Sequence, residues 1–257
     1  MFGIYKLFDE GTESPFIKRL YANILRFRDV CLPQNKHHEF DKLYINVFNP
    51  LYDCRRCVLE TYSLLCQYAD KVNKGQIIQA FPNSFSVNET IDEELRNLFN
   101  HFVNNGLRAY KNIQKLTSAY ELDIGPLYQQ DKNFDNYVCH LNEIDMHDFA
   151  KYVDEVRKDW GGNFQNLRNM MEHEGWELDK ISFEFINKSF EAKLPQVYDV
   201  DFFEYMKHIV CRLSDFVENI VLFIFQKDNA YPMFQINGNP WTISFNKEYD
   251  ETWLLKV

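Results

Sequence analysis

The chain has 257 residues, of which 46% are hydrophobic and 16% aromatic, and it carries a formal net charge of −10. This composition is sufficient for one substantial core and argues against a disordered or repetitive chain. The acidic balance argues against a general affinity for nucleic acid, which depends on clustered lysine and arginine. A nucleic-acid site would therefore be a local basic pocket, for which the candidates are Arg55, Arg56, Arg108, Lys111, Lys115, Arg157 and Lys158.

The N-terminus, MFGIYKLFDEG, has neither the basic lead nor the apolar stretch of a signal peptide, and no apolar run approaches membrane length. We therefore expect a cytoplasmic protein without membrane contact, whose six cysteines are reduced thiols. Cys54 and Cys57 form a CxxC inside a helical pattern, but no second Cys or His pair follows at zinc spacing. We expect two small residues on one helix face, and no metal or other cofactor.

The first third of the chain shows apolar residues at helical spacing. An amphipathic segment near residues 14–32 lies in an otherwise irregular extension and is closed by Pro33. A longer helical pattern runs from about 40 to 72. Within it, Asn49 and Pro50 predict a break, with a long helix from Leu51 onward.

The middle of the chain alternates breakers with helical patterns. The linker 74–88 predicts a loop with local strand or turn structure. A long helix is expected over about 89–122, capped by Asn88 or Thr90. Residues 123–136 are expected to turn, and a helix starting at Asp145 or His147 is expected to stop at Gly161 and Gly162.

The segment 161–176, GGNFQNLRNMMEHEGW, predicts a short amphipathic helix that Asn163 caps and Gly175 ends. It carries Arg168, a permanent cation that forks hydrogen bonds onto phosphate, and His173, which can transfer protons near neutral pH. At 100° per residue these two side chains lie about 140° apart and converge poorly within one chain. We therefore expect a symmetric partner to complete the site.

At these residues the chain resembles the HEPN superfamily of helical nucleases and nucleotide-binding domains. The HEPN signature is Arg, usually followed by Asn or another polar residue, with His four to six positions beyond the Arg. The phrase NLRNMMEHEGWEL is similar to a bacterial branch that writes I-R-N-x-L-E-H before a short strand and a long last helix. That branch also carries an Asp on an earlier long helix, and the matching position is Asp53 in LYDCRRCVLETYSLL. In order of elements, the resemblance covers roughly residues 40 to 228.

The resemblance implies a homodimeric, metal-independent endoribonuclease that leaves 2′,3′-cyclic phosphate and 5′-hydroxyl ends. His173 would act as acid and base, and Arg168 would stabilise the charge developing on phosphorus. Asn169 would position the phosphate or brace His173, and Asp53 would support Arg168. Such proteins commonly serve as toxins or in phage defence, so an antitoxin or regulatory protein is a candidate partner beside the RNA substrate.

Other interpretations stay open. Arg168 and His173 are equally consistent with a helix end whose side chains merely pair with Glu172 or Glu174, and Asp53 with a solvated carboxylate in the first turn of a helix. A noncatalytic HEPN-like module that binds nucleotide, RNA or protein, such as an antitoxin-like or scaffold protein, is the alternative function.

A second copy of the motif complicates the assignment. Residues 95–101, LRNLFNH, also place Arg96 and Asn97 before His101. The copy at 168–173 is favoured because it lies between glycine breaks, whereas Arg96 lies in a helix interior, and active sites gather beside helix ends and loops.

The C-terminal third predicts either one strand near 181–186 or a hairpin that contains it, and then the main core helix, capped by Asp199 or Asp201. Two strands joined through Asn237 and Gly238, with WLLKV as a third, are expected to share a small sheet with the first strand. The predicted fold is thus a mainly α, HEPN-like up-and-down helical bundle with a small β appendage. It forms a single domain, 1–257, with its core at about 40–228, an N-terminal extension at 1–35 and a C-terminal β segment at 229–257.

Overall fold

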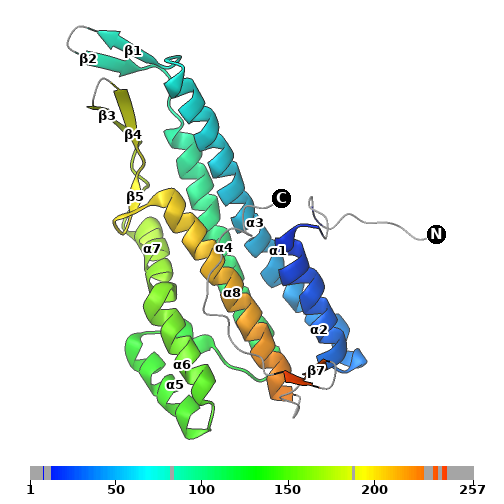
Figure 1. Cartoon of the computed structure of the whole chain (residues 1–257). Coiled ribbons are helices and arrows are strands. Elements are labelled where there is room, and N and C mark those ends of the chain that lie inside the picture. The colour runs from blue at the N-terminus through cyan, green and yellow to red at the C-terminus, as the bar shows by residue number, and fades with distance from the viewer. Residues whose placement is uncertain are drawn as a thin grey trace.

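The computed structural model describes residue 8 and residues 13–81, 84–186, 189–228, 234–236 and 239–241. The described chain is mainly helical, with short two-stranded hairpins. Its centre consists of three long helices that pack side by side, α3 (Gln34–Asn73), α4 (Asp92–Ala119) and α8 (Phe202–Asp228) (Figure 1). The predicted mainly α architecture is confirmed. No described helix combines the length and the apolar character that a membrane span needs.

Helix α3 is continuous, so the predicted break at Asn49 and Pro50 is wrong. A proline inside a helix lacks the N–H that would donate to the carbonyl four residues earlier, here that of Asn46. The side-chain amide of Asn112 on α4 donates to this Asn46 carbonyl at 2.7 Å. Because packing against α4 supplies the missing donor, α3 continues through the buried Pro50.

The linker after α3 forms an antiparallel hairpin of β1 (Ile78–Phe81) and β2 (Ser84–Val87), which agrees with the local strand structure predicted for it. Helix α4 then begins at Asp92 and ends at Ala119, inside the predicted range. The predicted cap is wrong, because the N-cap is Ile91 and no side chain caps the helix. Three acidic residues in the first turn of α4 instead interact favourably with the helix dipole.

The next part of the chain contains η2 (Gly125–Tyr128), α5 (Asp131–Glu143), α6 (His147–Val156), η3 (Arg157–Gly161) and α7 (Gly162–His173). The predicted turn at 123–136 is thus correct only for its first half. Phe134 and Leu141, seven residues apart, give α5 a buried side that the turn signals obscured.

The predicted helix break at Gly161 and Gly162 is also wrong. Both residues are helical, so α6, the π-helical turn η3 and α7 follow one another without interruption, and Asn163 does not cap a helix. These glycines permit close packing: a Cβ on Gly161 would lie 2.9 Å from the hydroxyl oxygen of Tyr110 on α4. The motif helix α7 therefore has no free N-terminus that could bind a phosphate.

Helix α8 is the central core helix, as its apolar stripe predicted. All eight residues of that stripe are buried, with at most 2% of their surface exposed: Phe202, Met206, Ile209, Val210, Leu213, Phe216, Val217 and Ile220. Of the two predicted caps, Asp201 is correct, because its Oδ1 accepts the backbone N–H of Phe203 at 2.8 Å. Phe216 packs against Tyr110 of α4 and Trp160 of η3, so α8 joins the motif segment to the bundle.

The strands form separate two-stranded hairpins, so the expected common sheet is wrong. Strand β3 (Ser182–Ile186) pairs with β4 (Ser189–Lys193), β5 (Gln196–Val197) with β6 (Val200–Asp201), and β7 (Phe234–Ile236) with β8 (Asn239–Trp241). Figure 1 places β3 and β4 near the β1–β2 hairpin and β7 at the opposite end of α8, too far away to pair. The turn residues Asn237 and Gly238 and the segment WLLKV lie outside the described residues.

The N-terminal amphipathic segment forms α1 (Pro15–Ile17), the π-helical turn η1 (Lys18–Asn23) and α2 (Ile24–Cys31), and α2 packs on α8. Phe16 and Leu20 are completely buried in the core. Arg19 joins this segment to α8 through ion pairs with Asp215, at 2.8 Å, and with Glu218.

Candidate functional site

The C-terminal end of α7 carries the motif side chains. Phe164 and Leu167 are buried and hold α7 against the core. After His173 the chain turns through Gly175, whose φ of +70° is left-handed, and the Trp176 N–H donates to the Met170 carbonyl at 3.1 Å. The prediction that Gly175 ends this helix is confirmed, so the motif stands beside a tight turn.

Arg168 and His173 approach each other through a carboxylate between them. Arg168 Nη2 pairs with Glu172 Oε2, and His173 Nε2 lies 4.0 Å from the same oxygen atom. The second arm of the guanidinium donates a long hydrogen bond of 3.4 Å to Asn169 Oδ1. The side chain of His173 is 70% exposed, that of Glu172 39% and that of Arg168 29%.

We call these three residues the Arg168–Glu172–His173 cluster. A helical separation of 140° does not keep the guanidinium and the imidazole apart, because both side chains bend toward Glu172. A single chain therefore adopts the arrangement in which Arg168 pairs with Glu172, the alternative to catalysis. A phosphate can replace the carboxylate on Arg168, since both anions accept two hydrogen bonds from one guanidinium.

Asp53 lies elsewhere. It is on α3, its side chain is 45% exposed, and its carboxylate lies 3.8 Å from Arg56 Nη1. The acidic partner of Arg168 is Glu172, four residues further along α7. A single chain thus does not bring Asp53 to Arg168. The helical spacing of four residues between Arg168 and Glu172 was the sequence signal for this pair.

The first copy of the motif does not form a comparable cluster. Arg96 Nη1 pairs with Glu177 Oε2 at 3.1 Å, and Nη2 donates to the Leu178 carbonyl at 3.4 Å. Arg96 thereby fastens the segment that follows α7 to α4. His101 is exposed and lies about 140° around α4 from Arg96, and no carboxylate of a described residue links the two. This difference and the turn at Gly175 separate the two copies, whereas the predicted break at Gly161 and Gly162 does not.

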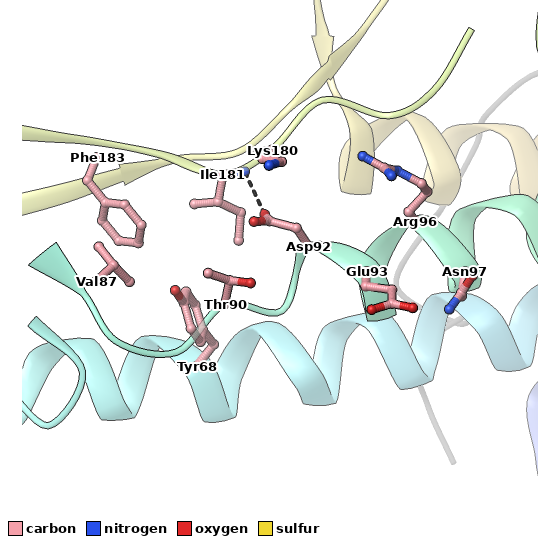
Figure 2. Close-up of a pocket in the computed structure, with 10 residues that line it drawn as sticks. All are labelled: Tyr68, Val87, Thr90, Asp92, Glu93, Arg96, Asn97, Lys180, Ile181 and Phe183. Carbon is pink, nitrogen blue, oxygen red and sulfur yellow. Dashed lines mark hydrogen bonds between the residues drawn. The ribbon is translucent and has the colours of Figure 1, made fainter. Parts of the chain in front are cut away.

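Arg96 and Asn97 also line a pocket of about 620 Å³ between the start of α4, the end of α3 and the segment that leads into β3 (Figure 2). One end of this pocket is apolar, and there the rings of Tyr68 and Phe183 pack together at 6.4 Å. In the middle of the pocket Asp92 accepts the Ile181 N–H at 2.9 Å, and Arg96 and Asn97 lie at the other end (Figure 2). His101 is not among the lining residues, so the pocket does not unite the Arg and His of this motif copy.

Four of the seven cations proposed for a basic pocket are engaged in the structure. Arg55 is completely buried, with its guanidinium 5.2 Å from the ring centroid of Phe16. Arg56 pairs with Glu60 on the same helix, and Lys158 pairs with Asp154.

Arg157 is the fourth engaged cation. Its guanidinium donates to the carbonyls of Leu127 and Gln129 at 2.7 Å each and pairs with Asp131 at 2.8 Å. These bonds hold η2 and the start of α5 against the π-helical turn before α7. Arg157 therefore fixes the fold around the motif, and these four cations, two on α3 and two on η3, are already held by other groups.

Cys54 and Cys57 are buried on one face of α3, as predicted for the CxxC. Burial raises the pKa of the Cys57 thiol to about 12, so it stays protonated at neutral pH and is a poor nucleophile. Cys54 Sγ lies 3.3 Å from the Phe102 carbonyl oxygen. Within the described residues, His, Cys, Asp and Glu side chains form no group of three or more that could hold a metal ion.

Comparison of the chain with protein-family models, with curated proteins and with solved structures gives no match. The case for a function therefore depends on the motif and on the geometry of α7.

Proposed function

We propose that the chain is a metal-independent endoribonuclease of HEPN type that acts as a homodimer. The observation that carries this proposal is the gathering of Arg168 and His173 about one carboxylate oxygen of Glu172 at the exposed end of α7. A guanidinium and an imidazole at one exposed point are the groups that RNA transesterification needs when no metal is used.

In this mechanism His173 accepts the proton of a ribose 2′-hydroxyl, and the 2′-oxygen attacks the adjacent phosphorus atom. The bond from phosphorus to the 5′-oxygen breaks, and the leaving oxygen receives a proton from an imidazolium. The products are a 2′,3′-cyclic phosphate and a 5′-hydroxyl. Arg168, once it has exchanged Glu172 for the phosphate, stabilises the negative charge of the transition state, and Asn169 orients the phosphate.

A second copy of the chain completes the site. One imidazole is the base and the imidazolium of the other copy is the acid, so both proton transfers occur without movement of a single ring. Asp53 supports Arg168 only across this dimer, since within one chain it pairs with Arg56. Sedimentation at micromolar concentration measures the association, and a monomer that still cleaves RNA would eliminate the composite site.

The test is a gel assay of total RNA with purified protein in the presence of a chelator. We expect the wild type to cleave and His173→Ala to lose about 10²- to 10⁴-fold in rate, the usual contribution of a general acid–base group. His101→Ala is the matched control, because His101 is also an exposed helical histidine five residues after an arginine. Equal background cleavage by wild type and His173→Ala removes the proposal, and loss in His101→Ala alone transfers it to the first motif copy.

The second candidate function is a noncatalytic module that binds nucleotide, RNA or protein through the same end of α7. The ion pair between Arg168 and Glu172 favours it, because a guanidinium held by a carboxylate is not positioned to stabilise charge on a scissile phosphate until that carboxylate is displaced. RNA that is retained but not cut, with an affinity that falls in Arg168→Ala, would select this function.

A role as a toxin or phage-defence effector is part of the first proposal. It is tested by expressing the protein in cells: we expect growth arrest with the wild type and none with His173→Ala.

A further inference from the structure

The pocket between the start of α4, the end of α3 and the segment that leads into β3 lies outside the proposed cleavage site (Figure 2). Neither Arg168 nor His173 is among its lining residues. Its volume of about 620 Å³ lies in the range of roughly 300 to 1,000 Å³ that small-molecule sites occupy. We call it the α4 pocket. It is large enough to enclose a small organic molecule.

One end of the α4 pocket is apolar and aromatic. Tyr68, Val87 and Phe183 line this end, with Ile181 beside them (Figure 2). The two ring centroids lie 6.4 Å apart, and the ring planes are tilted by 55°. The ring of Tyr68 is 5% exposed and is held in place, because its hydroxyl donates to the Glu89 carbonyl at 2.9 Å. A ligand group at this end therefore packs against aromatic rings and aliphatic side chains.

The carboxylate of Asp92 lies next to this aromatic end, in the middle of the pocket (Figure 2). Its Oδ1 accepts the Ile181 N–H at 2.9 Å, whereas its second oxygen accepts no hydrogen bond from a described residue. Burial, with the negative charges of Asp92 and Glu89 adding to it, raises the pKa of Tyr68. The aromatic end is therefore at a negative potential, and one carboxylate oxygen beside it is open to a donor.

The charges around the α4 pocket favour a cationic ligand. The charged residues that line it are Asp92, Glu93, Arg96 and Lys180. The charge of Arg96 is balanced by Glu177, whose Oε2 lies 3.1 Å from Nη1, and Arg96 stands at the end away from the rings (Figure 2). Lys180 is exposed, and its flexible stem allows the ammonium group to stay in water. Two carboxylates and one solvated ammonium then leave the pocket with a net negative charge.

We propose that the α4 pocket binds a small organic cation, a protonated amine on an aromatic body. The aromatic body packs against Tyr68 and Phe183, and the ammonium group donates to the open oxygen of Asp92. The faces of the two rings attract the same positive charge. A ligand with a carboxylate or phosphate at this point would instead be repelled by Asp92 and Glu93. The inference is independent of RNA cleavage, because no residue of the proposed cleavage site lines the pocket.

The experiment titrates the wild-type protein with 2-phenylethylammonium in a calorimeter and compares three related probes. Methylammonium has the charge without the ring, 2-phenylethanol has the ring without the charge, and 3-phenylpropanoate has the ring with the opposite charge. We expect 2-phenylethylammonium to bind about tenfold or more tightly than each of the other three. The reason is that ring burial and a hydrogen bond to a charged group each contribute at least about 1.5 kcal/mol, which corresponds to about tenfold in affinity.

Two variants place the ligand in the pocket. Asp92→Asn keeps an oxygen that accepts the Ile181 N–H but removes the negative charge, and it should weaken binding of 2-phenylethylammonium by about tenfold. Phe183→Leu keeps an apolar side chain but removes the ring, and it should weaken binding by about two- to tenfold. Glu94→Gln is the matched control, because Glu94 carries the same charge in the same first turn of α4, is exposed and does not line the pocket. It should bind like the wild type.

Several results would overturn the inference. Equal losses in Asp92→Asn and Glu94→Gln would mean that the probe is attracted by the acidic chain as a whole. Tighter binding of 3-phenylpropanoate than of 2-phenylethylammonium would assign the pocket to carboxylates, with Lys180 as the binding group. An absence of saturable binding of 2-phenylethylammonium at millimolar concentration would also remove the proposal. Circular dichroism checks that the variants keep their helices, and the comparison of the four probes on the wild type needs no variant.

Discussion

Replacement of Glu172 tests whether Arg168 binds a phosphate or serves only in an ion pair that stabilises the helix. In the free chain its carboxylate pairs with Arg168 and lies 4.0 Å from His173 Nε2. If Arg168 must bind a phosphate, Glu172 competes with the substrate. Glu172→Gln keeps the shape and the helix propensity of the side chain but removes the competing charge.

The magnitude follows from the exposure of the pair. With 29% and 39% of the two side chains exposed, water screens the interaction, and such pairs contribute about 0.2 to 1 kcal/mol. Because about 1.4 kcal/mol corresponds to a tenfold change in affinity, freeing Arg168 should tighten RNA binding by up to about fivefold. The unfolding free energy should fall by no more than about 1 kcal/mol.

Single-turnover cleavage at subsaturating and saturating protein concentrations is the assay. We expect Glu172→Gln to be faster when protein is subsaturating and unchanged at saturation, since only binding improves. The matched control is Glu174→Gln, which removes the same charge two residues away from an exposed position. An equal gain in Glu174→Gln would show a general effect of charge. Loss of cleavage in Glu172→Gln would show that the reaction requires the carboxylate. Either result would refute the idea that Glu172 competes with the RNA phosphate for Arg168.

Two further predictions concern the scaffold. Burial raises the pKa of Asp215 from its ordinary 3.8 to about 6, so the folded state holds this proton more tightly than the unfolded state, and the contribution of Asp215 to stability falls by about 3 kcal/mol as pH rises from about 4 to 6. In urea unfolding, Asp215→Asn should flatten the plot of unfolding free energy against pH over this range. Parallel plots for the variant and the wild type would contradict this prediction. Asn112→Ala should cost about 0.5 to 1.5 kcal/mol in the wild type and less in a Pro50→Ala background, where residue 50 regains the N–H that donates to Asn46. An equal cost in both backgrounds, measured as a double-mutant cycle, would show that the amide of Asn112 does not substitute for the missing donor.

The sequence alone was sufficient where a single local signal decides the structure. The buried stripe of α8, the helix end at the left-handed Gly175 and the strand near 181–186 each depend on spacing or on backbone freedom within a few residues. Such features are encoded locally, so neighbouring helices do not alter them.

The tertiary structure decided what depends on contacts between distant segments. Pro50 does not break α3 because Asn112, far along the chain, replaces its missing hydrogen bond, and Gly161 lies within a helix at a point where Tyr110 leaves no room for a Cβ. The same holds for charge: the sequence supplied Arg168, His173 and a set of cations. Only packing and ion pairing determined that Glu172 joins the first two and that Arg96 of α4 pairs with Glu177, because a side chain's partners are set by which surfaces the fold brings together.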